Sequence, residues 1–166
     1  MTTVARKVCM LGDFGVGKTS LVARFVRSTF SEKYLTTIGV KVDTKEIALA
    51  GRVSCKLVIW DIVGRSHLDA LNMTYLRGAS ALLLVADGTR EHSLSVALNL
   101  LMQSRTALPD AVVALAVNKL DLVERWEVAP TTLAEIRRSL PVFETSALSG
   151  DGVEAAFAEL ATRLLP

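Results

Sequence analysis

The chain has 166 residues, of which 51% are hydrophobic and 22% are charged, and its formal net charge at pH 7 is +2. This length fits a single domain over residues 1–166, and the composition excludes a disordered or fibrous protein. Basic and acidic residues are interspersed, so no basic run indicates a nucleic-acid partner.

Apolar runs alternate with helix-period stretches along the chain. The elements expected, in chain order, are a strand at Val4–Leu11, a helix at Lys18–Ser28, strands at Val40–Leu49 and Val53–Trp60 joined by a tight turn, a helix near Asp69–Leu76, a strand at Ala81–Ala86, a helix at Ser93–Thr106, a strand at Ala111–Val117, a helix at Thr131–Ser139, a strand at Val142–Glu144 and a helix at Val153–Leu165. Continuous apolar runs between helices predict a doubly wound α/β fold: a six-stranded, mostly parallel sheet with helices on both faces. In such folds the ligand lies at the carboxyl ends of the strands.

A phosphate-binding loop is predicted between the first strand and the first helix. Its residues are Gly12, Asp13, Phe14, Gly15, Val16, Gly17, Lys18 and Thr19, followed by Ser20. They fit the P-loop pattern G-x-x-x-x-G-K-[ST], in which glycines let successive N–H groups point at phosphate oxygens. Lys18 is expected to reach the β- and γ-phosphates, and the Thr19 hydroxyl to bind Mg²⁺. The sequence therefore predicts a nucleoside triphosphate site.

A second motif, D-x-x-G, ends the strand predicted at Val53–Trp60. Asp61 is expected to help hold magnesium, and the Gly64 N–H to approach a γ-phosphate. Asp and Gly after a strand are ordinary turn residues, so this pattern indicates a function only in combination with the P-loop.

The segment after the fifth predicted strand indicates the base. Guanine presents N1–H and a 2-amino group side by side, and the Asp121 carboxylate is able to accept both, whereas adenine has an unprotonated N1 there. Asn118 is expected to bridge the base and the P-loop, and the Lys119 stem to cover a face of the ring. Ser146 and Ala147, after the last short strand, are small enough to let backbone N–H groups contact guanine O6.

Together these motifs resemble the Ras superfamily of small GTPases, and among its branches Rab. The resemblance covers nearly the whole chain: residues 34–40 are similar to the family's first switch, 75–79 to the end of the second, and 143–147 to the last guanine motif. It implies a P-loop small G domain that binds GTP and GDP with Mg²⁺. Its switch loops are expected at about residues 30–40 and 61–77, held by the γ-phosphate and released on hydrolysis or exchange.

The resemblance also assigns residues that the patterns alone do not. By it, Thr37 binds magnesium and meets the γ-phosphate only in the triphosphate state. Phe30 packs against guanine and Tyr34 closes over the phosphates. Leu148 occupies the position after Ser-Ala that borders the base.

This chain departs from the family at positions that concern hydrolysis. Where the family has a glutamine that orients the attacking water, Arg65 has five donors and no acceptor. A usually small P-loop position holds Phe14, whose ring is expected to block the water and a partner's arginine finger. The family's Thr-Ala is the stiffer pair Ile62-Val63, and Leu148 replaces a common lysine.

The expected function is therefore a switch that hydrolyses GTP slowly, with Lys18, Thr37, Gly64 and Arg65 as the catalytic group. Two alternatives would restore some hydrolysis. Arg65 could act in cis as a charge-stabilising arginine finger, or His67 could take the place of the glutamine. A GTP-locked scaffold without meaningful turnover is the close alternative. A P-loop kinase or ATPase is the third, and the guanine-type residues argue against it.

Expected partners are GTP, GDP, an effector, an exchange factor and an activating protein, and the protein itself is expected to be a monomer. Apolar runs such as Ala81–Ala86 are too short to span a bilayer, and no lipid-anchor motif is present in the chain as given. Cys9 and Cys55 lie in apolar runs, which fits free thiols in a reducing cytosol. A cytoplasmic location is expected, with membrane association only if a C-terminal tail was removed.

Overall fold

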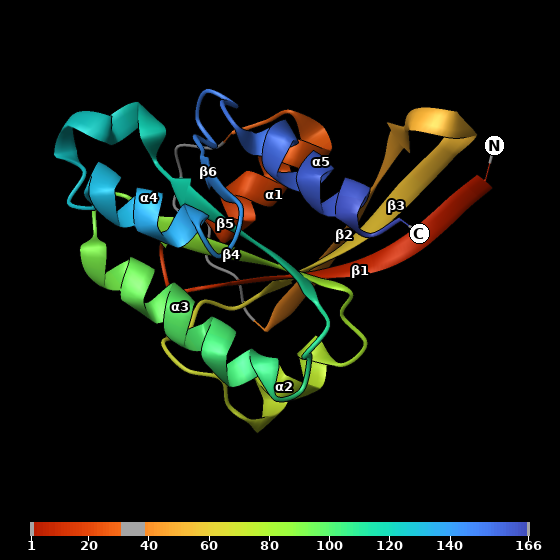
Figure 1. Ribbon diagram of the computed structural model, residues 1–166, viewed down its shortest axis with the longest axis horizontal. Coiled ribbons are helices and arrows are strands. Elements are labelled where there is room, and N and C mark those ends of the chain that lie inside the picture. The colour runs from red at the N-terminus through yellow and green to blue at the C-terminus, as the bar shows by residue number, and fades with distance from the viewer. Residues whose placement is uncertain (1, 31–38, 166) are drawn as a thin grey trace.

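The computed structural model describes residues 2–30 and 39–165. In this part of the chain six strands form one sheet in the order β2-β3-β1-β4-β5-β6 (Figure 1). The strands are β1 (Thr2–Gly12), β2 (Val40–Leu49), β3 (Val53–Ile62), β4 (Ala81–Asp87), β5 (Val112–Asn118) and β6 (Val142–Glu144). β2 is antiparallel to β3, and the other neighbouring pairs are parallel. The prediction of a mostly parallel α/β sheet is confirmed.

Helices cover both faces of this sheet. They are α1 (Lys18–Arg27), α2 (Ala70–Leu76), α3 (Glu91–Arg105), α4 (Pro130–Arg137) and α5 (Val153–Arg163), with short 3₁₀ segments η1 (Ala50–Arg52) and η2 (Leu120–Arg125). Figure 1 shows α1 and α5 on one side of the sheet and α2 and α3 on the other. This arrangement follows from the continuous apolar strands, because a strand that is apolar on both faces needs a cover on each.

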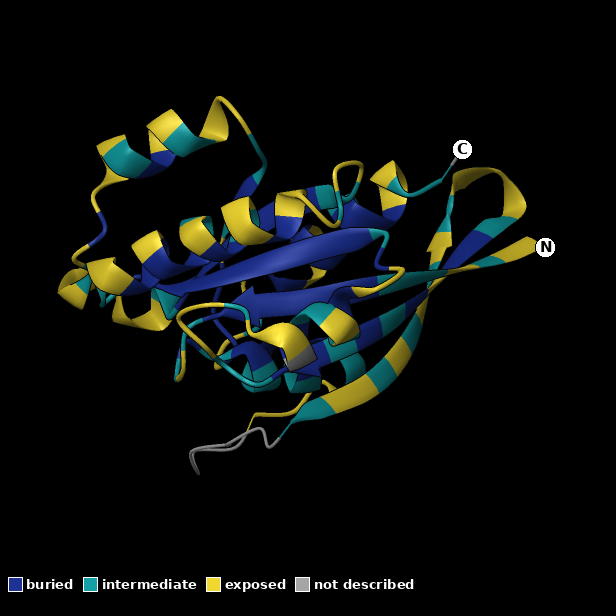
Figure 2. Cartoon of the chain, turned by 90° about the horizontal axis from the view of Figure 1, so that it is seen from below, coloured by how far each residue is buried: buried dark blue, intermediate teal, exposed yellow. Residues whose placement is uncertain are grey.

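Two hydrophobic cores result, one on each face. Along β4, Leu83 and Val85 pack on the side of α1 and α5, whereas Leu82 and Leu84 pack on the side of α2, α3 and α4. Successive strand residues point to opposite faces, so one strand serves both cores. Figure 2 shows the buried central strands between helices that are exposed on their outer surfaces.

Element boundaries differ from the sequence prediction by a few residues. Helix α2 starts one residue late because Asp69 is its N-cap, with the carboxylate accepting from Asn72 N at 2.8 Å. Helix α3 starts at Glu91, before the predicted Ser93, and its N-cap is Arg90. The segment η2 was not predicted.

The carboxyl ends of the parallel strands point to one edge of the sheet, at the left in Figure 1. The segments with the P-loop, the D-x-x-G motif and the guanine motifs leave the sheet at this edge. Among the described residues there is no helix with the length and hydrophobicity needed to cross a membrane.

Candidate functional site

The P-loop curls tightly against the neighbouring strand ends. Gly17 has φ of 100°, and a Cβ there would lie 2.3 Å from Asn118 Nδ2. Gly64 of the D-x-x-G motif also approaches the loop closely, since its Cβ would lie 2.6 Å from the Phe14 Cα. Both positions therefore require glycine, the first for its left-handed conformation and its contact, the second for its contact alone.

Lys18 extends back along the P-loop from the first turn of α1. Its ammonium donates to the carbonyl oxygens of Gly12 and Asp13, each at 3.2 Å, and the side chain is buried. Burial lowers the Lys18 pKa to about 8, although the nearby charges of Asp61 and Asp13 act in the opposite direction. A buried cation at a helix N-terminus is a suitable partner for a phosphate anion.

The Lys18 pKa predicts a pH dependence for the nucleotide-free protein. Because the folded-state pKa of about 8 lies below the ordinary 10.5, the unfolded chain holds more protons between these values. Stability therefore rises with pH across this window, and below pH 8 the full cost of the buried charge is present. This contribution is absent in Lys18→Met. The free energy of unfolding of wild type minus that of the variant is therefore expected to increase by about 3 kcal/mol between pH 8 and pH 10.5. Urea unfolding at several pH values measures it.

The control for this experiment is Lys56→Met, because Lys56 is an exposed lysine on β3. Its stability profile should run parallel to that of the wild type. A Lys18→Met profile that also runs parallel to wild type over this window would contradict the assignment.

Thr19 and Asp61 form the oxygen pair predicted for magnesium. The Thr19 hydroxyl donates to Asp61 Oδ2 at 2.6 Å, and Asp61 is buried at the end of β3. A hydroxyl and a carboxylate are hard oxygen ligands of the kind that Mg²⁺ prefers, and both lie beside the start of α1. The donor set therefore fits magnesium. Thr37, the third predicted ligand, lies outside the described residues.

The D-x-x-G segment is fastened to the P-loop through its backbone. Arg65 N donates to Gly12 O at 3.2 Å, while the Arg65 side chain is exposed. His67 is exposed too, with Nδ1 at 3.4 Å from the Ser66 hydroxyl. Ile62 is buried in the core on the side of α2, so its bulk serves packing.

Asn118 connects the P-loop to the segment predicted to meet guanine. Its Nδ2 donates to Val16 O at 3.0 Å, and its Oδ1 accepts from the Thr145 hydroxyl at 3.2 Å and from Ala147 N at 3.3 Å. The Ser146 hydroxyl donates to Asp121 Oδ1 at 2.7 Å. The guanine-type residues, distant in sequence, therefore share one hydrogen-bonded cluster.

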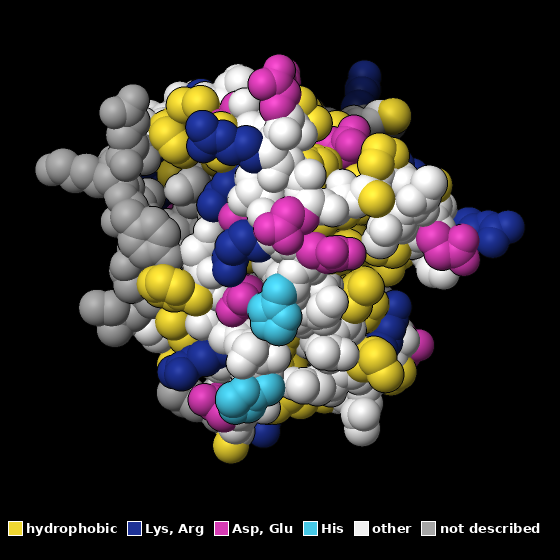
Figure 3. Space-filling model, turned by 90° about the vertical axis from the view of Figure 1, so that its left-hand side faces the viewer, with side chains coloured by type: hydrophobic (Ala, Val, Ile, Leu, Met, Phe, Trp, Pro, Cys, Tyr) yellow, Lys and Arg dark blue, Asp and Glu magenta, His cyan; other side chains and the backbone are white. Residues whose placement is uncertain are grey.

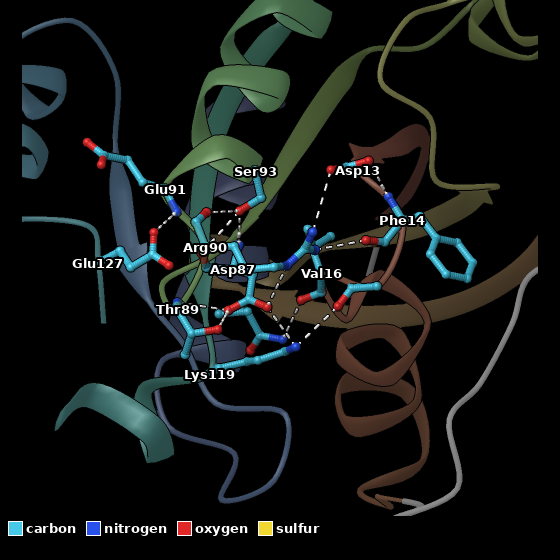
Figure 4. A network of polar contacts seen from close by, with 12 residues as sticks. Asp13, Phe14, Val16, Asp87, Thr89, Arg90, Glu91, Ser93, Lys119 and Glu127 are labelled. Atoms are coloured by element: carbon cyan, nitrogen blue, oxygen red, sulfur yellow. Dashed lines mark hydrogen bonds and ion pairs between the residues drawn. The ribbon is translucent and has the colours of Figure 1, made fainter. Parts of the chain in front are cut away.

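Lys119 lies beside a carboxylate that sequence reasoning missed. Its Nζ contacts Asp87 Oδ2 at 2.7 Å and donates to Gly15 O at 3.2 Å (Figure 4). Burial alone would raise the Asp87 pKa, but hydrogen bonds from Lys119 and Thr89 outweigh it and hold the pKa below its ordinary value. Asp87 ends the otherwise apolar strand β4, much as Asp61 follows the apolar run at the end of β3, and this signal was available in the sequence.

Arg24 of α1 was missed as well. Its Nε donates to Ala147 O at 2.8 Å and its Nη2 to Leu148 O at 2.7 Å. Arg24 therefore holds the backbone at Ala147 and Leu148, where Leu148 replaces the lysine common in the family. The Leu148 side chain itself is exposed.

The predicted residues Ser20 and Phe30 lie in and just after α1, and Phe30 is exposed. Tyr34 lies outside the described residues. Figure 3 shows this end of the molecule, where basic, acidic and hydrophobic side chains are interspersed and both histidines are exposed.

A P-loop, a Thr–Asp oxygen pair and a guanine-type cluster at one sheet edge define a P-loop nucleotide-binding protein. The family model described as "Ras family" matches residues 7–166. The rice "Ras-related protein RIC2" is 42% identical over 164 residues, covering 95% of this chain and 74% of that protein. Human "Ras-related protein Rab-22A" is 36% identical over 161 residues, covering 95% of this chain and 82% of that protein. "GTP-binding protein ypt5" of Schizosaccharomyces pombe is 34% identical over 168 residues, covering 99% of this chain and 80% of that protein.

The chain belongs to the Ras family, and within it is a Rab-like small GTPase. It is thus a GTP-binding switch protein by family.

Proposed function

We propose that this protein is a Rab-like switch that binds GTP and GDP with Mg²⁺ and hydrolyses GTP slowly, as one G domain. The observation that carries the proposal is a contrast within the site. The residues for phosphate, magnesium and guanine are linked by hydrogen bonds at one sheet edge, whereas Phe14 and Arg65 occupy the positions expected beside the attacking water.

The binding roles follow from the chemistry of each group. Lys18 and the N–H groups of the P-loop suit phosphate oxygens, Thr19 and Asp61 suit magnesium, and Asp121 suits guanine. When bound, Mg²⁺ supplies positive charge to the phosphates. Thr37, Tyr34 and the loops at about 30–40 and 61–77 are proposed as the switch, by the family resemblance alone.

Slow hydrolysis follows from two side chains. Arg65 offers donors only, so it is unable to accept a hydrogen bond from the attacking water. Phe14 is 53% exposed, and its ring is expected to occupy space that a small residue would leave for water or a partner's arginine. The alternative function, a GTP-locked scaffold, rests on the same two residues and differs only in the remaining rate.

The magnesium assignment predicts how nucleotide release responds to a chelator. In wild type, EDTA is expected to speed GDP release about tenfold or more, because it would remove the positive charge that Thr19 and Asp61 would hold beside the phosphates. Thr19→Ala should release GDP rapidly without EDTA. Adding EDTA should increase its release rate about twofold or less. Release of a fluorescent GDP analogue measures both rates.

A matched control is Thr162→Ala, because the hydroxyl of Thr162 on α5 donates to the Ala158 carbonyl within the same helix. This variant should keep the full response to EDTA. A Thr19→Ala variant with the same response as wild type would overturn the magnesium assignment. Competition with ATP in the same assay excludes or supports the kinase-type alternative.

A further inference from the structure

Three consecutive carbonyl oxygens of the P-loop accept side-chain donors from the neighbouring strand ends. Phe14 O accepts from Arg90 Nη2 at 2.8 Å, Gly15 O from Lys119 Nζ at 3.2 Å, and Val16 O from Asn118 Nδ2 at 3.0 Å. Figure 4 shows Arg90 and Lys119 on one side of the loop, with the Phe14 ring pointing away from Arg90. Lys119 and Asn118 belong to the guanine motif, but Arg90 belongs to no motif of the sequence.

Fixing a carbonyl also orients the amide that follows it. A trans peptide is planar, so its C=O and N–H point in opposite directions. When Phe14 O points at Arg90, the N–H of Gly15 faces the opposite side of the loop. The same reasoning applies to the N–H groups of Val16 and Gly17. Three N–H groups turned away from the donors form the kind of concave nest that binds anions.

Arg90 is itself held in place from several directions. Its Nε lies 3.3 Å from Asp87 Oδ2, and its Nη1 lies 3.7 Å from Asp13 Oδ2. Its backbone is the N-cap of α3, where its carbonyl accepts from the Ser93 hydroxyl at 2.6 Å. The guanidinium therefore spans from the end of β4 to the P-loop, with a donor in a fixed direction.

The pair with Asp13 adds an electrostatic role. Asp13 Oδ1 accepts from Phe14 N at 2.8 Å, which places a carboxylate on the loop that would bind phosphates. A negative charge there opposes an anionic ligand, and the Arg90 charge offsets it. Both contacts of Arg90 with the loop thus favour a bound anion.

We propose that Arg90 is a positioning residue for phosphate binding: it holds the Phe14 peptide so that the Gly15 N–H faces the nucleotide phosphates. This inference rests on the proposed function, since it assigns a role within nucleotide binding. The Arg90 side chain is 41% exposed, so its truncation leaves the hydrophobic cores intact.

The test combines Arg90→Met, Arg90→Lys and the control Arg138→Met, in which an equally long arginine is removed from the exposed Glu135 pair on α4. GDP release from Arg90→Met is expected to be about tenfold faster than from wild type, the order of one lost charge-assisted hydrogen bond. Arg90→Lys should fall between them, because lysine keeps the charge without the guanidinium fork. Arg138→Met should match wild type.

A spectroscopic readout separates positioning from general stability. In the ¹H–¹⁵N spectrum of the GDP-bound protein, the Gly15 amide is expected to move in Arg90→Met more than the Gly17 amide, whose preceding carbonyl is held by Asn118. The preference for GTP over ATP should stay unchanged, because Arg90 contacts neither Asp121 nor Ser146.

If Arg90→Met releases GDP at the wild-type rate and its Gly15 resonance does not move, the role assigned to Arg90 is overturned. The proposed function is unaffected by this outcome. If wild type itself fails to bind GDP, the proposed function and the assignment both fall. Arg90→Gln, which is too short to repeat the contacts, is the second variant should Arg90→Met not fold. Its release at the wild-type rate also overturns the assignment.

Discussion

The double variant Phe14→Gly/Arg65→Gln is expected to hydrolyse bound GTP at least tenfold faster than the wild-type chain, because positioned proton-transfer and water-orienting groups contribute about 10²–10⁴-fold. Glutamine supplies the acceptor that Arg65 lacks, and glycine removes the ring beside the loop. Phe14 is 53% exposed and the Arg65 side chain is exposed, so neither change empties a core. Single-turnover chromatography of bound nucleotide measures the rate.

The control for this variant is Met102→Ala/Arg138→Gln, which removes an exposed hydrophobic side chain from α3 and an exposed arginine from the C-cap of α4. It should hydrolyse GTP at the wild-type rate. The single variants identify the contribution of each residue. A double variant slower than wild type would contradict the account and indicate that Arg65 acts in cis on the transferred phosphate.

The second large effect is expected for Asp121→Asn. The amide of the introduced asparagine is expected to weaken GTP binding at least a hundredfold, because a site built for paired hydrogen bonds strongly rejects a ligand that cannot form them. An asparagine presents N–H donors toward the N1–H and 2-amino donors of guanine. The Asn oxygen is still able to accept from the Ser146 hydroxyl, which now donates to Asp121 Oδ1 at 2.7 Å, so the cluster itself is retained.

Competition titration against a fluorescent guanine nucleotide measures this loss. A xanthine nucleotide, with a carbonyl in place of the 2-amino group, should regain part of the affinity in the variant. Asp110→Asn, at an exposed aspartate before β5, is the matched control and should bind like wild type. An Asp121→Asn variant with unchanged guanine affinity would show that the base is recognised elsewhere.

The fold and the central part of the site could be predicted from the sequence because their signals are local. The P-loop is a contiguous pattern between a strand and a helix, and the alternation of apolar runs with helices fixes a parallel sheet. Parallel strands bring their carboxyl ends to one edge. Thr19 and Asp61, 42 residues apart, therefore meet there.

The supporting arginines could not be predicted in this way. Arg24 reaches Ala147 across 123 residues, and Arg90 reaches Phe14 across 76. A partly buried arginine on a helix or in a loop has no periodicity that shows where its guanidinium will lie. The segment η2 follows Lys119, whose φ of 72° is uncommon for a non-glycine residue, and no propensity rule indicates such a turn.

The central claim is that hydrolysis is slow while nucleotide binding is retained. The most direct test loads the wild-type protein with GTP and Mg²⁺, removes excess nucleotide and follows bound GTP and GDP for a day. Ras hydrolyses GTP at about 3–5 × 10⁻⁴ per second, and a rate about tenfold lower would leave most of the GTP intact after two hours. Complete conversion to GDP within the first hour would contradict the account.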